Sequence, residues 1–170
     1  MSIEWKLCNQ DEGCWDEYLL LLLHHYEELS FPYGFEMALS FIGNPMVAGN
    51  ALIAQERESG RTVAALGFVF GTGQDYYENE RVCQLEALYI ASVHRGSALY
   101  LTMLRQLVTT LQERYTQTET IQFWAPSDRE DLRRLFGACF ELVKTNEKDF
   151  GRIDLFTSTV DRLAAFCKRI

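Results

Sequence analysis

The feature that most constrains the fold is a junction in the middle of the chain, where a strand pattern runs into a helix pattern. Residues Val82–Ala91 read as a long strand, and His94–Tyr115 carry leucines at helical spacing. A helix that opens after a strand leaves unpaired backbone N–H groups aimed at one place, with the positive end of the helix dipole behind them. Such a junction can hold a pyrophosphate group.

Strand and helix signals alternate along the rest of the chain. We expect further strands over Ile3–Leu7, Ala51–Arg57, Thr62–Phe70, Thr120–Ala125, Phe140–Lys144 and Phe150–Thr157. We expect further helices over Glu12–Leu29, Phe35–Phe41, Arg129–Ala138 and Val160–Lys168. Asn9-Gln10-Asp11 and Ser127-Asp128 are candidate caps, Gly43-Asn44-Pro45 should end the second helix, and Asn146–Asp149 should join the last two strands. Because no linker or repeat divides the sequence, it predicts one α/β domain over residues 1–170, with about seven strands and four or five helices.

The composition suits a folded domain and limits its partners. Apolar residues make up 48% of the chain, which is enough for a sizeable core. The 16 Lys and Arg residues are outnumbered by 24 Asp and Glu residues, so the formal net charge is −8. This balance argues against nucleic acid as a partner, since nonspecific binding needs clustered basic residues. Cationic small molecules are the electrostatically easier partners.

Targeting signals and metal-binding patterns are both missing from the sequence. The longest apolar run, Leu19–Leu23, is far shorter than the roughly 20 residues that a membrane-spanning helix needs. The N-terminus lacks the features of a signal peptide, so we expect a cytoplasmic protein without membrane contact. The 5 cysteines are widely spaced and form no Cys-x-x-Cys pair. We interpret them as buried apolar residues and expect no metal site.

The residues of the central junction resemble a known family. Leu88-Tyr89-Ile90, followed after four residues by Arg95-Gly96-Ser97 and a leucine-rich helix, are similar to the acetyl-CoA binding motif of the GNAT N-acetyltransferases, Gln/Arg-x-x-Gly-x-Gly/Ala. The order of expected elements matches that fold across nearly the whole chain. The resemblance implies a mixed central sheet, flanked by helices, whose fourth and fifth strands splay apart to form a cleft.

The resemblance also implies how acetyl-CoA would bind as the acyl donor. The main chain of Leu88 and Ile90, with Tyr89 between them, would bind the pantetheine arm. Asp128 follows the fifth strand where the family often places an Asn that contacts CoA. The backbone amides that would hold the pyrophosphate are those of Arg95, Gly96, Ser97, Ala98, Leu99 and Tyr100. Ala98 and Tyr100 stand where the motif has small residues, so the ring of Tyr100 must point elsewhere or obstruct the phosphate.

Catalytic roles follow from the same resemblance. Glu86 stands two residues before Leu88, where many family members carry a glutamate that acts as general base; the alternative is a solvated strand carboxylate. We expect its side chain to share a face with Gln84, Leu88 and Ile90. The family's usual general acid, a tyrosine, is replaced by Phe136. The thiolate then leaves unassisted, or Tyr89 or Tyr100 supplies the proton.

The acceptor and the overall function remain open between alternatives. Tyr33, Phe35 and Glu36 lie where this fold usually closes over the acceptor, although ordinary packing explains them too. His94 could help a phosphate, but we interpret it as solvated. One hypothesis is an N-acetyltransferase that acts on a small amine by direct attack; the other is a catalytically weakened GNAT-like domain that binds a ligand or a protein. The terminal helix offers Leu163, Phe166 and Ile170 to a second subunit, so a homodimer is a further option.

Overall fold

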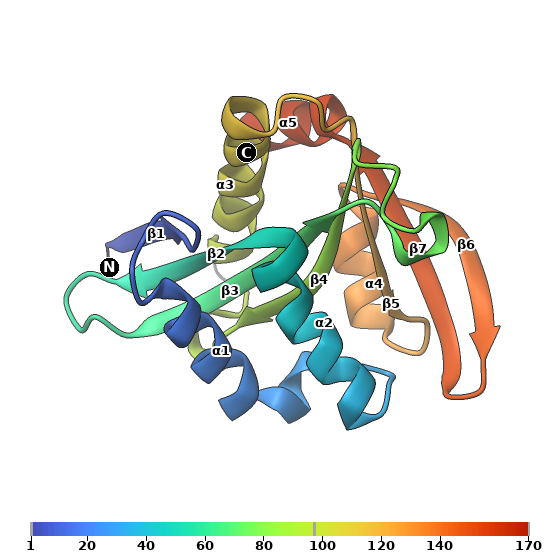
Figure 1. Cartoon of the computed structure of the whole chain (residues 1–170), viewed down its shortest axis with the longest axis horizontal. Helices are drawn as coiled ribbons and strands as arrows, with labels where there is room; N and C mark the ends of the chain where they lie inside the picture. Colours follow the sequence, from blue (N-terminus) through green and yellow to red (C-terminus); the bar gives the residue numbers. More distant parts are fainter. Residues whose placement is uncertain (1, 97, 170) are drawn as a thin grey trace.

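The computed structural model describes residues 2–96 and 98–169, and these form one seven-stranded sheet with helices on both faces (Figure 1). The strands are β1 (Ile3–Leu7), β2 (Gly49–Glu56), β3 (Thr62–Phe70), β4 (Val82–Ile90), β5 (Thr120–Pro126), β6 (Glu141–Lys148) and β7 (Gly151–Thr159). The helices are α1 (Cys14–His24), α2 (Phe35–Ala48), α3 (Leu99–Arg114), α4 (Glu130–Gly137) and α5 (Val160–Lys168). Short 3₁₀ turns occupy η1 (Tyr26–Leu29), η2 (Gly73–Asp75) and η3 (Ser92–His94). The predicted α/β class is confirmed.

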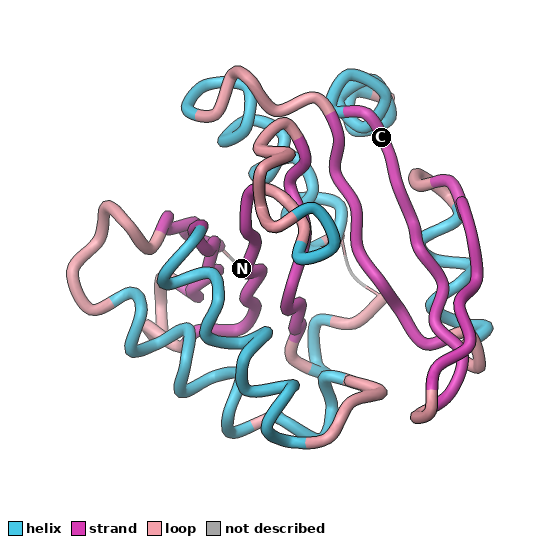
Figure 2. Tube along the Cα trace, turned by 45° about the vertical axis from the view of Figure 1, so that its right-hand side comes forward, coloured by secondary structure: helices cyan, strands magenta, loops and turns pink. Residues whose placement is uncertain are grey.

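The sheet is mixed, and its one parallel pairing is short. The strand order is β1-β2-β3-β4-β5-β7-β6, and every neighbouring pair is antiparallel except β4 and β5. These two pair only where Val82–Gln84 run beside Thr120–Gln122. Beyond that point the strands diverge, as Figures 1 and 2 both show. The predicted splay between the fourth and fifth strands is therefore confirmed.

Two apolar cores stabilise the two faces of the sheet. On one face α1 and α2 pack on β2, β3 and β4 around fully buried Tyr18, Leu22 and Ile42. On the other face the leucines of α3, together with α5 and Phe136 of α4, form the larger core. Leu163 is buried there and Phe166 packs against it, so the expectation that these residues face a second subunit is wrong; Ile170 lies outside the described residues.

A β-bulge in β4 changes which side chains share a face. Gly67 of β3 lies opposite Ala87, but the next residue, Phe68, lies opposite Leu85, so Glu86 is the extra residue of β4. A bulge interrupts the strict alternation of side chains along a strand. Leu88 and Ile90 consequently pack with the α3 core, whereas Glu86 reaches Asn44 of α2. The prediction that Glu86 shares a face with Leu88 and Ile90 is wrong.

Several predicted boundaries differ from the structure because tertiary contacts outweigh local signals. Helix α2 continues through Pro45, which is buried against β3, and α3 begins only at Leu99 because η3 and Gly96, at φ +81°, come first. The last hairpin turns between Lys148 and Gly151, later than expected. The first helix ends at His24 and resumes as η1.

The expected helix caps are not formed. Helix α1 has Gly13 at its N-cap, in the left-handed conformation, and no side-chain cap. Ser127 does not cap α4, because its hydroxyl donates to the buried carboxylate of Asp154 instead.

The cysteines are all buried and carry free thiols, as predicted. Among the residues that the structure describes, no helix is long and apolar enough to cross a bilayer, and no group of three or more His, Cys, Asp or Glu side chains is arranged to hold a metal ion.

Candidate active site

The divergence of β4 and β5 opens a cleft of about 920 Å³. Its floor consists of β4 from Gln84 to Ile90 and β5 from Phe123 to Pro126. The segment between α1 and α2 forms one wall, and the β4–α3 loop with parts of α3 and α4 forms the other. The size and mixed lining suit a ligand of moderate size held by a few polar groups.

The β4–α3 loop borders one end of the cleft and has the backbone shape of an anion site. Gly96 has φ +81°, with open space where a side chain would begin, and the first turn of the 16-residue helix α3 has no side-chain cap. In an α-helix the first backbone N–H groups lie at the positive end of the helix dipole, so the start of α3 is electrostatically suited to an anion. These features fit a pyrophosphate. Ala98 is the N-cap residue, Leu99 is buried, and Ser97 lies outside the described residues.

Arg95 stabilises this loop with its side chain. Its Nη2 lies 2.6 Å from Oε2 of Glu28, and its Nε donates to the carbonyl oxygen of Ile90 at 2.9 Å. Its guanidinium also lies over the ring of Tyr89, 5.6 Å from the centroid. The positive charge of Arg95 is thus already paired, and backbone N–H groups are the main attraction left for a phosphate.

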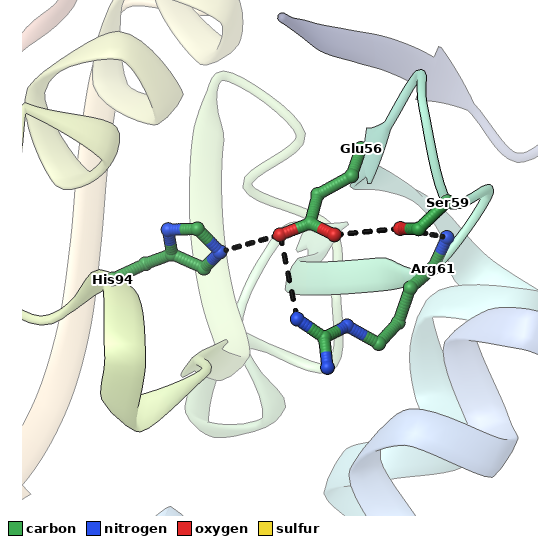
Figure 3. Close-up of polar contacts among 4 residues, drawn as sticks. All are labelled: Glu56, Ser59, Arg61 and His94. Carbon is green, nitrogen blue, oxygen red and sulfur yellow. Dashed lines mark hydrogen bonds and ion pairs between the residues drawn. The ribbon is translucent and has the colours of Figure 1, made fainter. Parts of the chain in front are cut away.

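His94 anchors the same loop to the end of β2. Its ring is only 6% exposed, and its Nε2 lies 3.1 Å from Oε1 of Glu56 at the end of β2 (Figure 3). The other carboxylate oxygen of Glu56 accepts from Ser59, and Arg61 completes the cluster. The hydrogen bond from Ser59, followed by those from His94 and Arg61, lowers the pKa of Glu56 despite its partial burial. The interpretation of His94 as solvated is wrong.

Tyr100 turns its ring away from the phosphate loop. The side chain is buried in the α3 core, near Phe136, and its hydroxyl lies 3.9 Å from the sulfur of Cys139. Burial raises the pKa of this phenol. The hydroxyl of this bulky residue is thus directed toward Cys139, although the residue also contributes to the cleft lining.

Glu86 lies in the middle of the cleft floor, on the α2 side of the sheet. It is only 7% exposed and accepts hydrogen bonds from Gln84 at 2.6 Å and Asn44 at 3.3 Å. Gln84 in turn accepts from Gln122 of β5, which fixes its amide. Burial raises the pKa of the Glu86 carboxyl, and the two hydrogen bonds offset part of that rise. None of the ion pairs among described residues involves Glu86.

The acceptor candidates are placed differently from each other. Tyr33 lines the cleft, and burial followed by the nearby charge of Glu86 raises its pKa to about 12. Glu36 is exposed on the first turn of α2 and does not line the cleft. Asp128, which is a candidate contact for CoA and not for the acceptor, is also exposed and outside the cleft lining. Its neighbour Arg129 does line the cleft.

Tyr89 and Tyr100, the two tyrosines named as replacements for the family's usual general acid, both line the cleft. Phe136 packs edge to face on Phe123, with 4.7 Å between ring centroids. Tyr89 lies on the α1 side, stacked on His25 at 4.6 Å, and burial raises its pKa. The Tyr100 hydroxyl is directed toward Cys139 in the α3 core.

Several polar residues of the site were not identified from the sequence. Gln122 and Asn44 position Glu86 through contacts between distant elements, for which no local pattern exists. Arg129 donates to Ser30 across the cleft mouth and pairs with Asp131. Only Gln84 had a usable signal, because it stands two residues before Glu86 on the same strand.

Comparisons with known proteins identify the fold. No family model matches the sequence, and no curated protein matches it. Solved structures do match: an acetyltransferase of the GNAT family from Staphylococcus aureus has a TM-score of 0.68 at 10% identity, covering 94% of this chain and 99% of that one. The spermidine/spermine N-acetyltransferase SpeG from Vibrio cholerae has a TM-score of 0.63 at 9% identity, covering 97% and 99%. A chain of the NatC complex, bound to Gag peptide and CoA, has a TM-score of 0.67 at 16% identity, covering 94% and 99%. The chain thus has the fold of the GNAT acetyltransferases, as the motif predicted.

Proposed function

We propose that this protein is an acetyl-CoA-dependent N-acetyltransferase that transfers the acetyl group to the primary amine of a small molecule. The observation that carries the proposal is Glu86, a buried carboxylate with a raised pKa on the floor of the cleft. A general base works best when its pKa lies near the working pH, and burial moves a carboxylate in that direction. The fold, and the position of the β4–α3 junction at the cleft, provide independent support.

The proposed reaction is a direct attack within a ternary complex. The carboxylate of Glu86 accepts a proton from the amine, directly or through one water. The amine nitrogen forms a bond to the carbonyl carbon of the thioester, and the bond from that carbon to sulfur breaks. The sulfur leaves as a thiolate and takes its proton from solvent. The N–H groups of the β4–α3 loop and the free edge of β4 would bind the donor and orient its thioester toward Glu86.

Calorimetric titration with acetyl-CoA tests the proposal. We expect saturable binding, together with release of CoA when a primary amine is added. If no binding is seen at millimolar acetyl-CoA, the enzyme hypothesis is wrong.

The second candidate is a domain that binds acetyl-CoA but transfers its acetyl group poorly or not at all. The observation in its favour is Phe136, whose ring has no proton to donate where the GNAT motif has a tyrosine. Binding without measurable turnover on a broad panel of amines would favour this candidate over the first.

A further inference from the structure

The part of the cleft around Glu86 has an aromatic lining. Phe31, Tyr33 and Phe41 all line the cleft from the α2 side. Tyr33 stacks on Phe41 with 4.9 Å between centroids, and Phe31 lies 6.3 Å from Phe41. Phe150, at the turn of the last hairpin, is outside the lining and packs edge to face on Tyr33, with 4.9 Å between ring centroids.

Trp124 extends this lining on the opposite side of Glu86. Its neighbours Phe123 and Ala125 belong to the α3 core, and side chains alternate along a strand, so Trp124 faces the α2 side together with Gln122. Gln122 is linked through Gln84 to Glu86. One buried carboxylate and four aromatic side chains therefore line the same cleft, and Tyr33 lies near Glu86.

The charges that line the cleft are unsuited to a polycation. Glu28 and Asp131 line it but are already paired with Arg95 and Arg129. Lys144, which is outside the cleft lining, places a further cation 5.6 Å from the centroid of the Trp124 ring. A polyamine needs separate carboxylates along its length, and of the acidic residues in the lining only Glu86 and the exposed Glu27 form no ion pair with a described residue. A single ammonium beside an apolar body matches this distribution better.

We infer that the acceptor is a primary monoamine with a compact apolar or aromatic body, which stacks among Phe31, Tyr33, Phe41 and Trp124 while its nitrogen faces Glu86. This inference rests on the proposed function and specifies its acceptor. Tyr33 and Phe41 then determine specificity, since they contact the body of the amine and not the reacting atoms.

The test compares phenethylamine with spermidine as acceptors at equal pH and ionic strength. We expect a kcat/KM at least about tenfold higher for phenethylamine, the difference that one favourable aromatic contact produces. Replacing Phe41→Ala or Tyr33→Ala should raise the KM for phenethylamine about tenfold and lower the ratio of kcat/KM for phenethylamine to that for spermidine by about the same factor. Phe35→Ala is the matched control, because Phe35 is an exposed aromatic residue of the same helix outside the cleft lining.

The outcomes separate this inference from the proposed function. The inference would be overturned if spermidine were turned over as well as phenethylamine or better. It would also be overturned if the ratio of kcat/KM for the two amines did not change in either variant while both variants unfolded thermally like the parent. In both cases the acetyltransferase function stands. If acetyl-CoA does not bind at all, the proposed function fails. Titration of phenethylamine and spermidine into the protein alone still decides the inference, since only the first should bind and Phe41→Ala should weaken it.

Discussion

At the scale of single residues, the chemistry depends on how Glu86 is held. Burial against α2 favours the neutral carboxylic acid, while the amides of Gln84 and Asn44 favour the carboxylate. Burial is the larger influence, so the pKa lies above that of an ordinary glutamate. A raised pKa makes this carboxylate a stronger proton acceptor than an ordinary glutamate.

Replacing Glu86→Gln should lower kcat/KM for acetyl transfer about 100-fold at neutral pH, because a positioned general base contributes about that much. The loss should shrink at high pH, where the amine deprotonates unaided. In the unmodified enzyme the rate should fall on acidification through the raised pKa of Glu86, and this step should be missing in the variant. Rate profiles against pH measure both effects. Glu27→Gln, at the exposed rim of the same cleft, is the control, and equal losses in both variants would argue against a base at Glu86.

Gly67 of β3 has no side chain, and this allows Tyr18 of α1 and Pro45 of α2 to pack closely on the sheet next to the site. A Cβ built there would lie 2.1 Å from the hydroxyl of Tyr18 and 2.8 Å from Cγ of Pro45. Gly67→Ala should therefore lower the free energy of unfolding by about 2 kcal/mol through overpacking. Thermal unfolding would show it as a drop in Tm of about 6 °C for a chain of this length. Gly43→Ala, where nothing lies within 4 Å, should instead leave stability equal or slightly higher.

At the scale of elements, a polar network centred on Asp154 of β7 links the segments on the β5 side of the cleft. This fully buried carboxylate accepts from Ser127 after β5, Thr145 of β6 and Arg133 of α4. Burial alone would raise the pKa of Asp154, but the hydrogen bonds from Thr145, Ser127 and Arg133 outweigh it and lower the pKa. One residue thus joins three elements that border or support the cleft.

Asp154→Asn should lower the free energy of unfolding by about 2 kcal/mol at neutral pH, since hydrogen bonds to a charged group are lost. A lowered pKa means that the ionised aspartate stabilises the fold above the unfolded-state pKa of about 4, and that this contribution disappears as the pH falls through the folded-state pKa. The difference in the free energy of unfolding between the variant and the parent protein should therefore become smaller below about pH 4. Urea unfolding at several pH values measures this, with Glu141→Gln in the exposed pair with Arg162 as the control. A difference that does not vary with pH would contradict the assignment of the stabilisation to the ionised form.

The elements themselves were largely predictable, whereas their exact junctions were not. Runs of strand-forming residues bounded by turn residues located all seven strands. Helical spacing located α3 and α5, because that pattern reflects burial on one face. The continuation of α2 through Pro45 depends on its packing against β3, which no local signal reveals. The start of α3 depends on the anchoring of His94 by Glu56, from a strand far away in the sequence.

The candidate site shows the same division. Leu88, Ile90 and Glu86 were found because a motif of fixed spacing contains them. The orientation of Glu86 was predicted wrongly, since the bulge depends on pairing with β3. The aromatic lining was missed except for Tyr33, because Phe31, Phe41 and Trp124 come from three elements that meet only in the folded chain.

At the scale of the whole molecule, the net charge of −8 opposes the approach of a polyanionic donor. Arg95, the cation of the β4–α3 loop, is already paired with Glu28, so binding relies on short-range contacts with backbone N–H groups. Repulsion from the distant acidic residues acts over a longer range and is screened by salt.

The affinity for acetyl-CoA should accordingly rise when the ionic strength is increased from about 0.01 M to 0.1 M, as the Debye length falls from about 30 Å to 10 Å. We expect roughly a twofold gain, from screening of the repulsion by the net charge. Calorimetry at constant pH across this range, with sodium chloride as the salt, measures it. A steep loss of affinity would instead indicate a cluster of free cations at the donor site, as in nucleic-acid-binding proteins.

The bulge in β4 has a consequence for how such a protein can change over time. In a regular strand, residues two apart share a face. The proposed base, Glu86, would then lie on the same face as Leu88 and Ile90, whose main chain is proposed to contact the donor. The extra residue at Glu86 places its side chain on the α2 face, whereas Leu88 and Ile90 lie on the α3 face. Substitutions on the α2 side can then alter which amine is accepted without disturbing the surface that contacts the donor. One inserted residue makes the two halves of the site separately adjustable.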